Sequence, residues 1–279
     1  MHYTTHIKSK IGWFDVDLKE LFRYRDLIFL FFKRNYITRY KQTILGPLWL
    51  ILNPLITVSL YALVFGKLAG LSTEGTPQFV FYLCSNALWT FFATSLTQTA
   101  GTFTANAAMM GKVYFPRLVM PISSVLTGMS DMLIQVIMLI IIMIAYAISG
   151  YSFDLSFNLL LAPLIILQAG FLGLGCGIII ASLTTKYRDL AVLVGFGVQL
   201  WMYATPVVYT SALIPEKYLT LYMLLNPMTS MMECWRNAVT GAGTFYASYW
   251  GISWIVTFVV LFAGIMLFNR VEKTFMDTV

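Results

Sequence analysis

Charged residues are scarce in this sequence. Only 11% of its 279 residues are charged and 59% are hydrophobic, whereas about a quarter of the residues in a soluble domain are charged. So few charges cannot cover a water-facing surface, which excludes a soluble globular domain or a soluble binding module. The net charge of +6 does not indicate nucleic-acid binding, because the basic residues follow a membrane topology and do not gather on one soluble face.

Residues that carry redox or metal chemistry are also few. The three cysteines, Cys84, Cys176 and Cys234, are odd in number and the first two lie in apolar runs, so no disulfide framework is predicted. The only histidines, His2 and His6, lie near the amino end, and no group of His, Cys and carboxylates has metal-ligand spacing. We therefore expect no metal site and no cofactor bound by this chain.

A motif for nucleotide hydrolysis is missing as well. A phosphate loop ends in Gly-Lys-Ser or Gly-Lys-Thr, because backbone amides and the lysine hold the phosphates. The two Gly-Lys pairs of this sequence continue into Leu68 and Val113 instead. An obvious histidine or pair of carboxylates for general-base catalysis is also lacking, which disfavours a membrane-embedded glycosyl or acyl transferase but leaves it as an alternative. The sequence predicts a chain without its own catalytic site.

Long apolar runs are what the sequence has in abundance. A helix needs about 20 apolar residues to cross about 30 Å of hydrocarbon. The apolar runs predict transmembrane helices at 44–65, 79–96, 122–148, 159–183, 190–209 and 248–268. The second of these carries Ser85, Asn86 and Thr90, which suits a helix that faces protein or a watery path. In the fourth, Gly170, Gly173 and Gly177 predict close helix packing.

The distribution of positive charge gives the orientation. If the amino end is cytoplasmic, fifteen of the eighteen Lys and Arg residues fall in cytoplasmic segments, and only Lys67, Lys217 and Arg236 fall outside. We therefore predict an all-α integral membrane fold with six transmembrane helices and both termini in the cytoplasm. Residues 1–43 would form a cytoplasmic tail with an amphipathic interface helix, and residues 44–279 the six-helix transmembrane domain.

Three segments are predicted to be helical without spanning the membrane. Residues 17–40 form an amphipathic pattern typical of a helix in the cytoplasmic interface, which either anchors the first span or docks a partner protein. Residues 106–117 predict a short cytoplasmic helix, near which Lys112 and Arg117 face the headgroups; by themselves they are ordinary positive-inside charges. Residues 212–243 predict two short helices, broken at Asn226-Pro227, in the outer interface with Trp235 and Tyr222 as belt residues.

One acidic residue, Asp131, lies inside a predicted span. Intramembrane charges are functional candidates by default. Because Asp131 is predicted about two turns from the cytoplasmic end of its helix, hydration at the interface or a polar partner is the favoured explanation.

Four stretches of this sequence resemble one family, the transmembrane subunits of ATP-binding-cassette exporters for O-antigen, capsular polysaccharide and teichoic acid. They are RYKQTILGPLWLILNP at 39–54, KVYFPRLVMP at 112–121, KYRDL with the later WMYATPVVY at 186–209, and LLNPMTSMMECWRNAVTG at 224–241. The resemblance implies a bacterial inner (plasma) membrane protein in which two copies pair with two separate ATPase subunits, where ATP and Mg bind. The implied cargo is an undecaprenyl-pyrophosphate-linked O-antigen or similar polyprenyl-linked glycan; the alternative is teichoic acid, another lipid or a drug.

The resemblance also implies roles for particular residues. The cytoplasmic loop with Lys186, Tyr187, Arg188 and Asp189 is similar to the coupling helix that contacts the ATPase. Residues 106–117 are similar to a gate helix on the cytoplasmic side, which makes Lys112 and Arg117 candidates for recruiting the lipid pyrophosphate.

Residues 212–243 are similar to gate helices on the outer side. The first and fifth spans would line the conduit, where aromatic faces can pack on sugar rings without fixing one register. The candidates are Trp49, Tyr61, Trp201 and Tyr203, for which ordinary packing or a place in the aromatic belt is the alternative.

Overall fold

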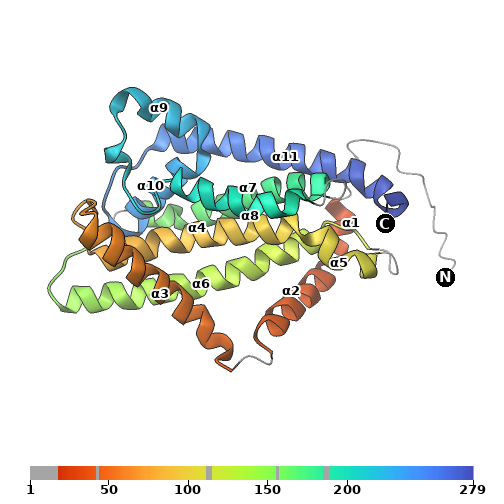
Figure 1. Ribbon diagram of the computed structural model, residues 1–279, viewed down its shortest axis with the longest axis horizontal. Helices are drawn as coiled ribbons and strands as arrows, with labels where there is room; N and C mark the ends of the chain where they lie inside the picture. The colour runs from red at the N-terminus through yellow and green to blue at the C-terminus, as the bar shows by residue number, and fades with distance from the viewer. Residues whose placement is uncertain (1–17, 42–43, 111–114, 155–156, 185–188, 279) are drawn as a thin grey trace.

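The computed structural model describes residues 18–41, 44–110, 115–154, 157–184 and 189–278, and regular structure in these ranges is entirely helical (Figure 1). The elements are α1 (Leu18–Arg23), α2 (Arg25–Tyr40), η1 (Gly46–Leu48), α3 (Trp49–Tyr61), η2 (Ala62–Leu68), α4 (Gln78–Ala100), α5 (Thr102–Met110), α6 (Val119–Ile148), η3 (Phe157–Leu161), α7 (Ala162–Thr184), α8 (Leu190–Tyr203), η4 (Ser211–Leu213), α9 (Glu216–Leu225), α10 (Pro227–Thr240) and α11 (Ala247–Thr278). The predicted all-α membrane fold is confirmed.

Five helical stretches of the described chain are long and apolar enough to cross a membrane. They are Gly46–Leu68, Gln78–Ala100, Val119–Ile148, Phe157–Thr184 and Ala247–Arg270. Each coincides with a predicted span. In place of the predicted fifth span stands α8, an apolar helix of 14 residues, which is about 21 Å long at 1.5 Å per residue.

Helix α8 ends at Tyr203, earlier than the predicted end at Tyr209. The physical reason is Pro206, which has no N–H and disfavours helical geometry in the residue before it. The unwound chain keeps its polar groups satisfied, because the carbonyls of Pro206 and Tyr209 accept hydrogen bonds from Arg236 at 2.8 and 3.0 Å. Irregular backbone of this kind is tolerated at membrane depth when protein surrounds it.

Helix α4 lies at the centre of the bundle, between α6 and α7. Its side chains are mostly buried, including Ser85 and Asn86, so the prediction that this helix faces protein is confirmed. Glycines on α7 allow the close approach. A Cβ on Gly177 would lie 2.5 Å from Thr99 Cβ, and one on Gly173 would lie 2.8 Å from Ser95 Cβ. Small residues at a helix contact are the usual device for tight packing in membranes.

The amino-terminal segment is two helices, because the chain bends at Tyr24 between α1 and α2. Helix α2 packs on α6 and runs obliquely along it toward the start of α3 (Figure 1). A cluster of apolar side chains packs α2 against the end of the bundle at which α5 and the carboxyl end of α11 lie. Its buried members are Phe31, Phe103, Phe115, Val119, Met120, Ile178, Ala181 and Phe268.

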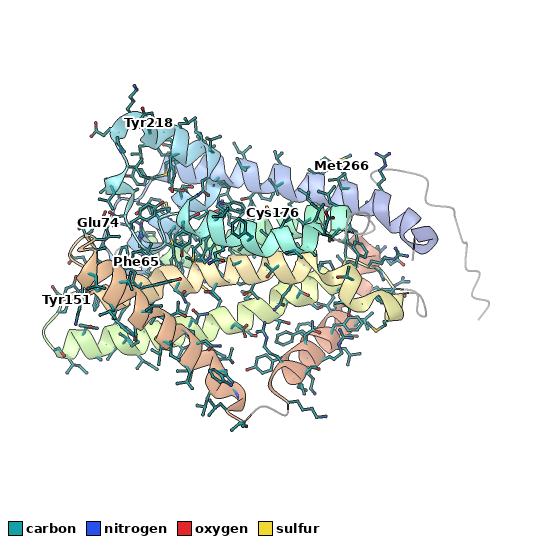
Figure 2. All side chains as sticks on the ribbon, viewed as in Figure 1. Phe65, Glu74, Tyr151, Cys176, Tyr218 and Met266 are labelled. Carbon is teal, nitrogen blue, oxygen red and sulfur yellow. The ribbon has the colours of Figure 1, made fainter. Side chains whose placement is uncertain are left out.

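The opposite end of the molecule carries the loops and the short helices α9 and α10. Figure 2 shows Glu74, Tyr151 and Tyr218 at this end and Met266 toward the other. The predicted break at Asn226-Pro227 is confirmed, since α9 ends at Leu225 and α10 begins at Pro227.

Candidate functional site

An ion pair joins α2 to α6 within the bundle. The Arg39 guanidinium at the carboxyl end of α2 donates to the Asp131 carboxylate. Asp131 lies twelve residues after Val119, where α6 begins, which is about 18 Å along the helix and deeper than predicted. The Asp131 side chain is 15% exposed and that of Arg39 is 33% exposed. The polar partner expected for Asp131 is therefore Arg39, whose positive charge compensates the carboxylate.

A cavity of about 330 Å³ opens beside this ion pair, between α2, α3, α4 and α6. Its walls combine charged, amide, hydroxyl and aromatic side chains. The lining residues are Arg39, Trp49, Leu50, Asn53, Pro54, Thr90, Asp131 and Gln135. Buried Asn86 donates to Gln135 Oε1 at 3.3 Å and thereby orients the Gln135 amide. Such a mixture can bind a polar ligand by several hydrogen bonds at once.

A second cavity, of about 380 Å³, lies where α8 ends against α9. Asn226 organises its wall: its amide nitrogen donates to Ala204 O at 2.7 Å and Thr205 Oγ1 at 2.9 Å, and its Oδ1 accepts from Trp201 Nε1 at 3.0 Å. The rings of Trp201, Tyr218 and Tyr222 also line this cavity. Asn226 thus ties the end of α8 to the corner between α9 and α10.

A third cavity, of about 510 Å³, is apolar and lies between α4, α7, α8 and α11. Aliphatic side chains make up most of its wall, together with Cys176 and Trp201. Trp201 thus borders two cavities and packs edge-to-face on Phe92 at 5.0 Å between ring centroids.

The four aromatics predicted to line a conduit are spread along α3 and α8. Trp49 begins α3, borders the cavity beside Asp131 and is 39% exposed. Tyr61 ends α3, and its hydroxyl contacts the Met202 sulfur of α8 at 3.6 Å. Tyr203 ends α8 and is 52% exposed. The contact between Tyr61 and Met202 brings the end of α3 next to the end of α8. The structure does not gather all four rings around one site.

A buried charge network holds α10 in place. Arg236 and Glu233 form an ion pair one turn apart and are 3% and 1% exposed. The Arg236 guanidinium also lies over the Phe81 ring at 4.7 Å, while Ser211 N donates to Glu233 Oε1 at 2.8 Å. The sequence predicts Arg236 to lie on the outer side, in one of the two short helices of residues 212–243, without assigning it a partner. Its i, i+3 spacing from Glu233 on a short helix is the signal that could have indicated the pair.

The prediction that Trp235 is a belt residue is wrong. Trp235 is 1% exposed, and its Nε1 donates to Cys84 O of α4 at 2.9 Å. The physical reason is that α10 packs between α4, α7 and α11, which cover the Trp235 ring.

The residues predicted to act on the cytoplasmic side are described in part. Lys112, Lys186, Tyr187 and Arg188 lie outside the described residues. Asp189 precedes α8, and its carboxylate accepts the N–H of Leu190, the first residue of that helix, at 3.1 Å. Arg117 is half-buried in the turn before α6.

Close to that turn, α2 contacts α5. Arg34 donates to Asn106 Oδ1 at 3.2 Å and lies over the Phe31 ring at 4.8 Å. The end of the bundle at which α1 and α5 lie therefore carries the basic side chains of Arg34 on α2 and Arg117 beside α6.

These observations define a multi-span helical membrane protein with polar and aromatic cavities between its helices. The sequence family described as ABC-2 type transporter matches residues 26–240, so this chain belongs to that family. It is 30% identical over 253 residues to the O-antigen export system permease protein RfbA of Klebsiella pneumoniae, with 90% of this chain and 94% of the relative covered.

Two further relatives agree. The chain is 29% identical over 221 residues to the O-antigen export system permease protein RfbA of Myxococcus xanthus, covering 78% of this chain and 82% of the relative. It is 24% identical over 252 residues to the polysialic acid transport protein KpsM of Escherichia coli, covering 88% and 94%.

Proposed function

We propose that this chain is the membrane subunit of an ATP-driven exporter of lipid-linked polysaccharide. The observation that carries the proposal is similarity over nearly the whole chain to permeases named for O-antigen export. Two copies would form the conduit, and two separate ATPase subunits would supply the energy. The cargo would be an undecaprenyl-pyrophosphate-linked O-antigen or a related polyprenyl-linked glycan.

The exposed helix faces support a pairing of two copies. Helix α8 has no buried residue, and its apolar side chains Val192, Leu193 and Phe196 are at least 59% exposed. In α3, Pro54 and Val58 are the only buried residues. In the proposed dimer, α3 and α8 of the two copies enclose the path, on which Trp49, Tyr61, Trp201 and Tyr203 offer aromatic faces to passing sugars.

The end with α1, α5 and the carboxyl end of α11 would face the cytoplasm of a bacterial cell, with the inner (plasma) membrane around the bundle. The loop containing Lys186, Tyr187, Arg188 and Asp189 would contact the ATPase. Lys112 and Arg117 would pair with the lipid pyrophosphate as it leaves water, since cations at such a mouth form charge-assisted hydrogen bonds with phosphate.

Cells lacking this chain test the proposal. Surface polysaccharide should disappear and polymer should accumulate on the cytoplasmic side, and the same should occur when the partner ATPase is inactivated. Reintroducing the intact chain is the control and should restore surface delivery. Unchanged surface polysaccharide in cells without the chain would reject the proposal.

A further inference from the structure

We infer that the cavity beside the Arg39–Asp131 pair binds one sugar unit of the transported polymer. This inference rests on the proposed function, because it takes the cargo to be a glycan. The volume of about 330 Å³ lies at the lower end of the range for small-ligand sites. The cavity lies between four helices, so a ligand in it would contact α2, α3, α4 and α6 together.

The polar groups of the wall match the hydroxyls of a sugar. Arg39 can only donate hydrogen bonds and ionised Asp131 can only accept them, while Asn53, Thr90 and Gln135 can do both. Each sugar hydroxyl is also both a donor and an acceptor. A ring with several hydroxyls can therefore bond to several of these side chains at once.

The ion pair itself favours a neutral ligand over a phosphate. Arg39 is already compensated by Asp131. A phosphate group next to Arg39 would also lie next to the Asp131 carboxylate, and like charges repel strongly where little water is present. A polyol can accept from Arg39 and donate to Asp131 without leaving either charge uncompensated.

Trp49 and the first turns of α3 supply the apolar part of the wall. The half-exposed Trp49 ring offers a flat face on which the C–H face of a sugar ring can pack. Leu50 and Pro54 line the cavity beside it. Because Pro54 has no N–H, the Leu50 carbonyl lacks its usual intrahelical donor, which leaves an acceptor on the backbone of this wall.

The test measures binding to the complete transporter, permease with its ATPase, in lipid nanodiscs. The probe is the delipidated surface polysaccharide of the source organism, and inorganic pyrophosphate is the second probe. Three variants change the wall: Thr90→Val removes one hydroxyl, Trp49→Leu removes the ring face, and Arg39→Lys keeps the ion pair but loses the planar guanidinium. Thr94→Val, one turn further along α4 and outside the cavity wall, is the matched control.

We expect Thr90→Val to weaken polysaccharide binding by about threefold to tenfold, as for a neutral hydrogen bond. Trp49→Leu and Arg39→Lys should weaken it by about tenfold or more, and Thr94→Val should not change it. If Arg39→Lys does not assemble, the comparison of Thr90→Val with Thr94→Val still decides the matter, because both replace one threonine by an isosteric residue on the same helix.

Three outcomes would overturn the inference. The first is that the polysaccharide binds every variant with the same affinity as the wild type. The second is that Thr94→Val weakens binding as much as Thr90→Val does. The third is that the wild type binds no polysaccharide, whether or not pyrophosphate binds in an Arg39-dependent manner. In each case polysaccharide delivery in cells separates the claims: if it still requires the chain, the proposed function stands and only this site is rejected.

Discussion

Replacing Arg236 by methionine should destabilise the protein strongly. Arg236 is 3% exposed and pairs with Glu233, and its guanidinium also donates to the carbonyls of Pro206 and Tyr209. Methionine has a similar length but no donor. The change would leave the buried Glu233 carboxylate without its counter-ion and two carbonyls of the unwound segment without their donor.

The magnitude follows from these losses. Removing one partner of a buried ion pair costs about 3–5 kcal/mol. At about 2–4 °C per kcal/mol for a chain of this size class, the midpoint of thermal unfolding should fall by about 6–20 °C. Part of the loss comes from the uncompensated Glu233 carboxylate. The free energy of unfolding of the double variant Glu233→Gln, Arg236→Met should therefore exceed that of Arg236→Met by about 0.5–3 kcal/mol.

Thermal unfolding in detergent, followed by tryptophan fluorescence, measures the effect. Lys217→Met on exposed α9 is the control and should change stability by about 0.5 kcal/mol or less. A decrease for Arg236→Met no larger than that of Lys217→Met would refute the reasoning, because it would mean that the guanidinium is not holding the segment between α8 and η4.

Two further predictions follow from α7 and from the loop between η2 and α4, which contains Glu74. Gly177→Ala should lower the yield of folded protein, measured by fluorescence-detected size exclusion, because its Cβ would lie 2.5 Å from Thr99 Cβ; Gly195→Ala, with nothing within 4 Å, should not. Burial, and next the Glu233 carboxylate, raise the pKa of Glu74 above 4.5. The folded chain therefore holds this proton more tightly than the unfolded chain, and stability should fall as the pH rises from about 4.5 through the raised pKa. Glu74→Gln should remove that part of the pH dependence, and an unchanged profile of unfolding temperature against pH would contradict the assignment.

Features that depend on neighbours in the sequence could be predicted. The apolar runs gave the long spans because crossing hydrocarbon requires continuous apolar helix. Asn226-Pro227 indicated the corner between α9 and α10, since proline cannot continue a helix without losing a donor. Gly173 and Gly177 indicated a close helix contact, because small residues permit such an approach, and the structure places that contact between α7 and α4.

Features that depend on distant parts of the chain could not be predicted. Arg39 and Asp131 are 92 residues apart, and only the oblique course of α2 along α6 joins them. The burial of Trp235 and Arg236 also depends on contacts with distant parts of the chain. Helix α10 is short and only partly apolar, so its own sequence suits an interface as well as it suits the interior between α4, α7 and α11.

Transport by the purified components tests the central claim most directly. The chain and its partner ATPase would be reconstituted into vesicles with the ATPase outward, lipid-linked polysaccharide would be added to the outer leaflet, and polymer protected inside would be measured. We predict protected polymer only when both proteins and ATP are present. Polymer that stays outside under these conditions, or hydrolysis of ATP by this chain alone, would contradict the account.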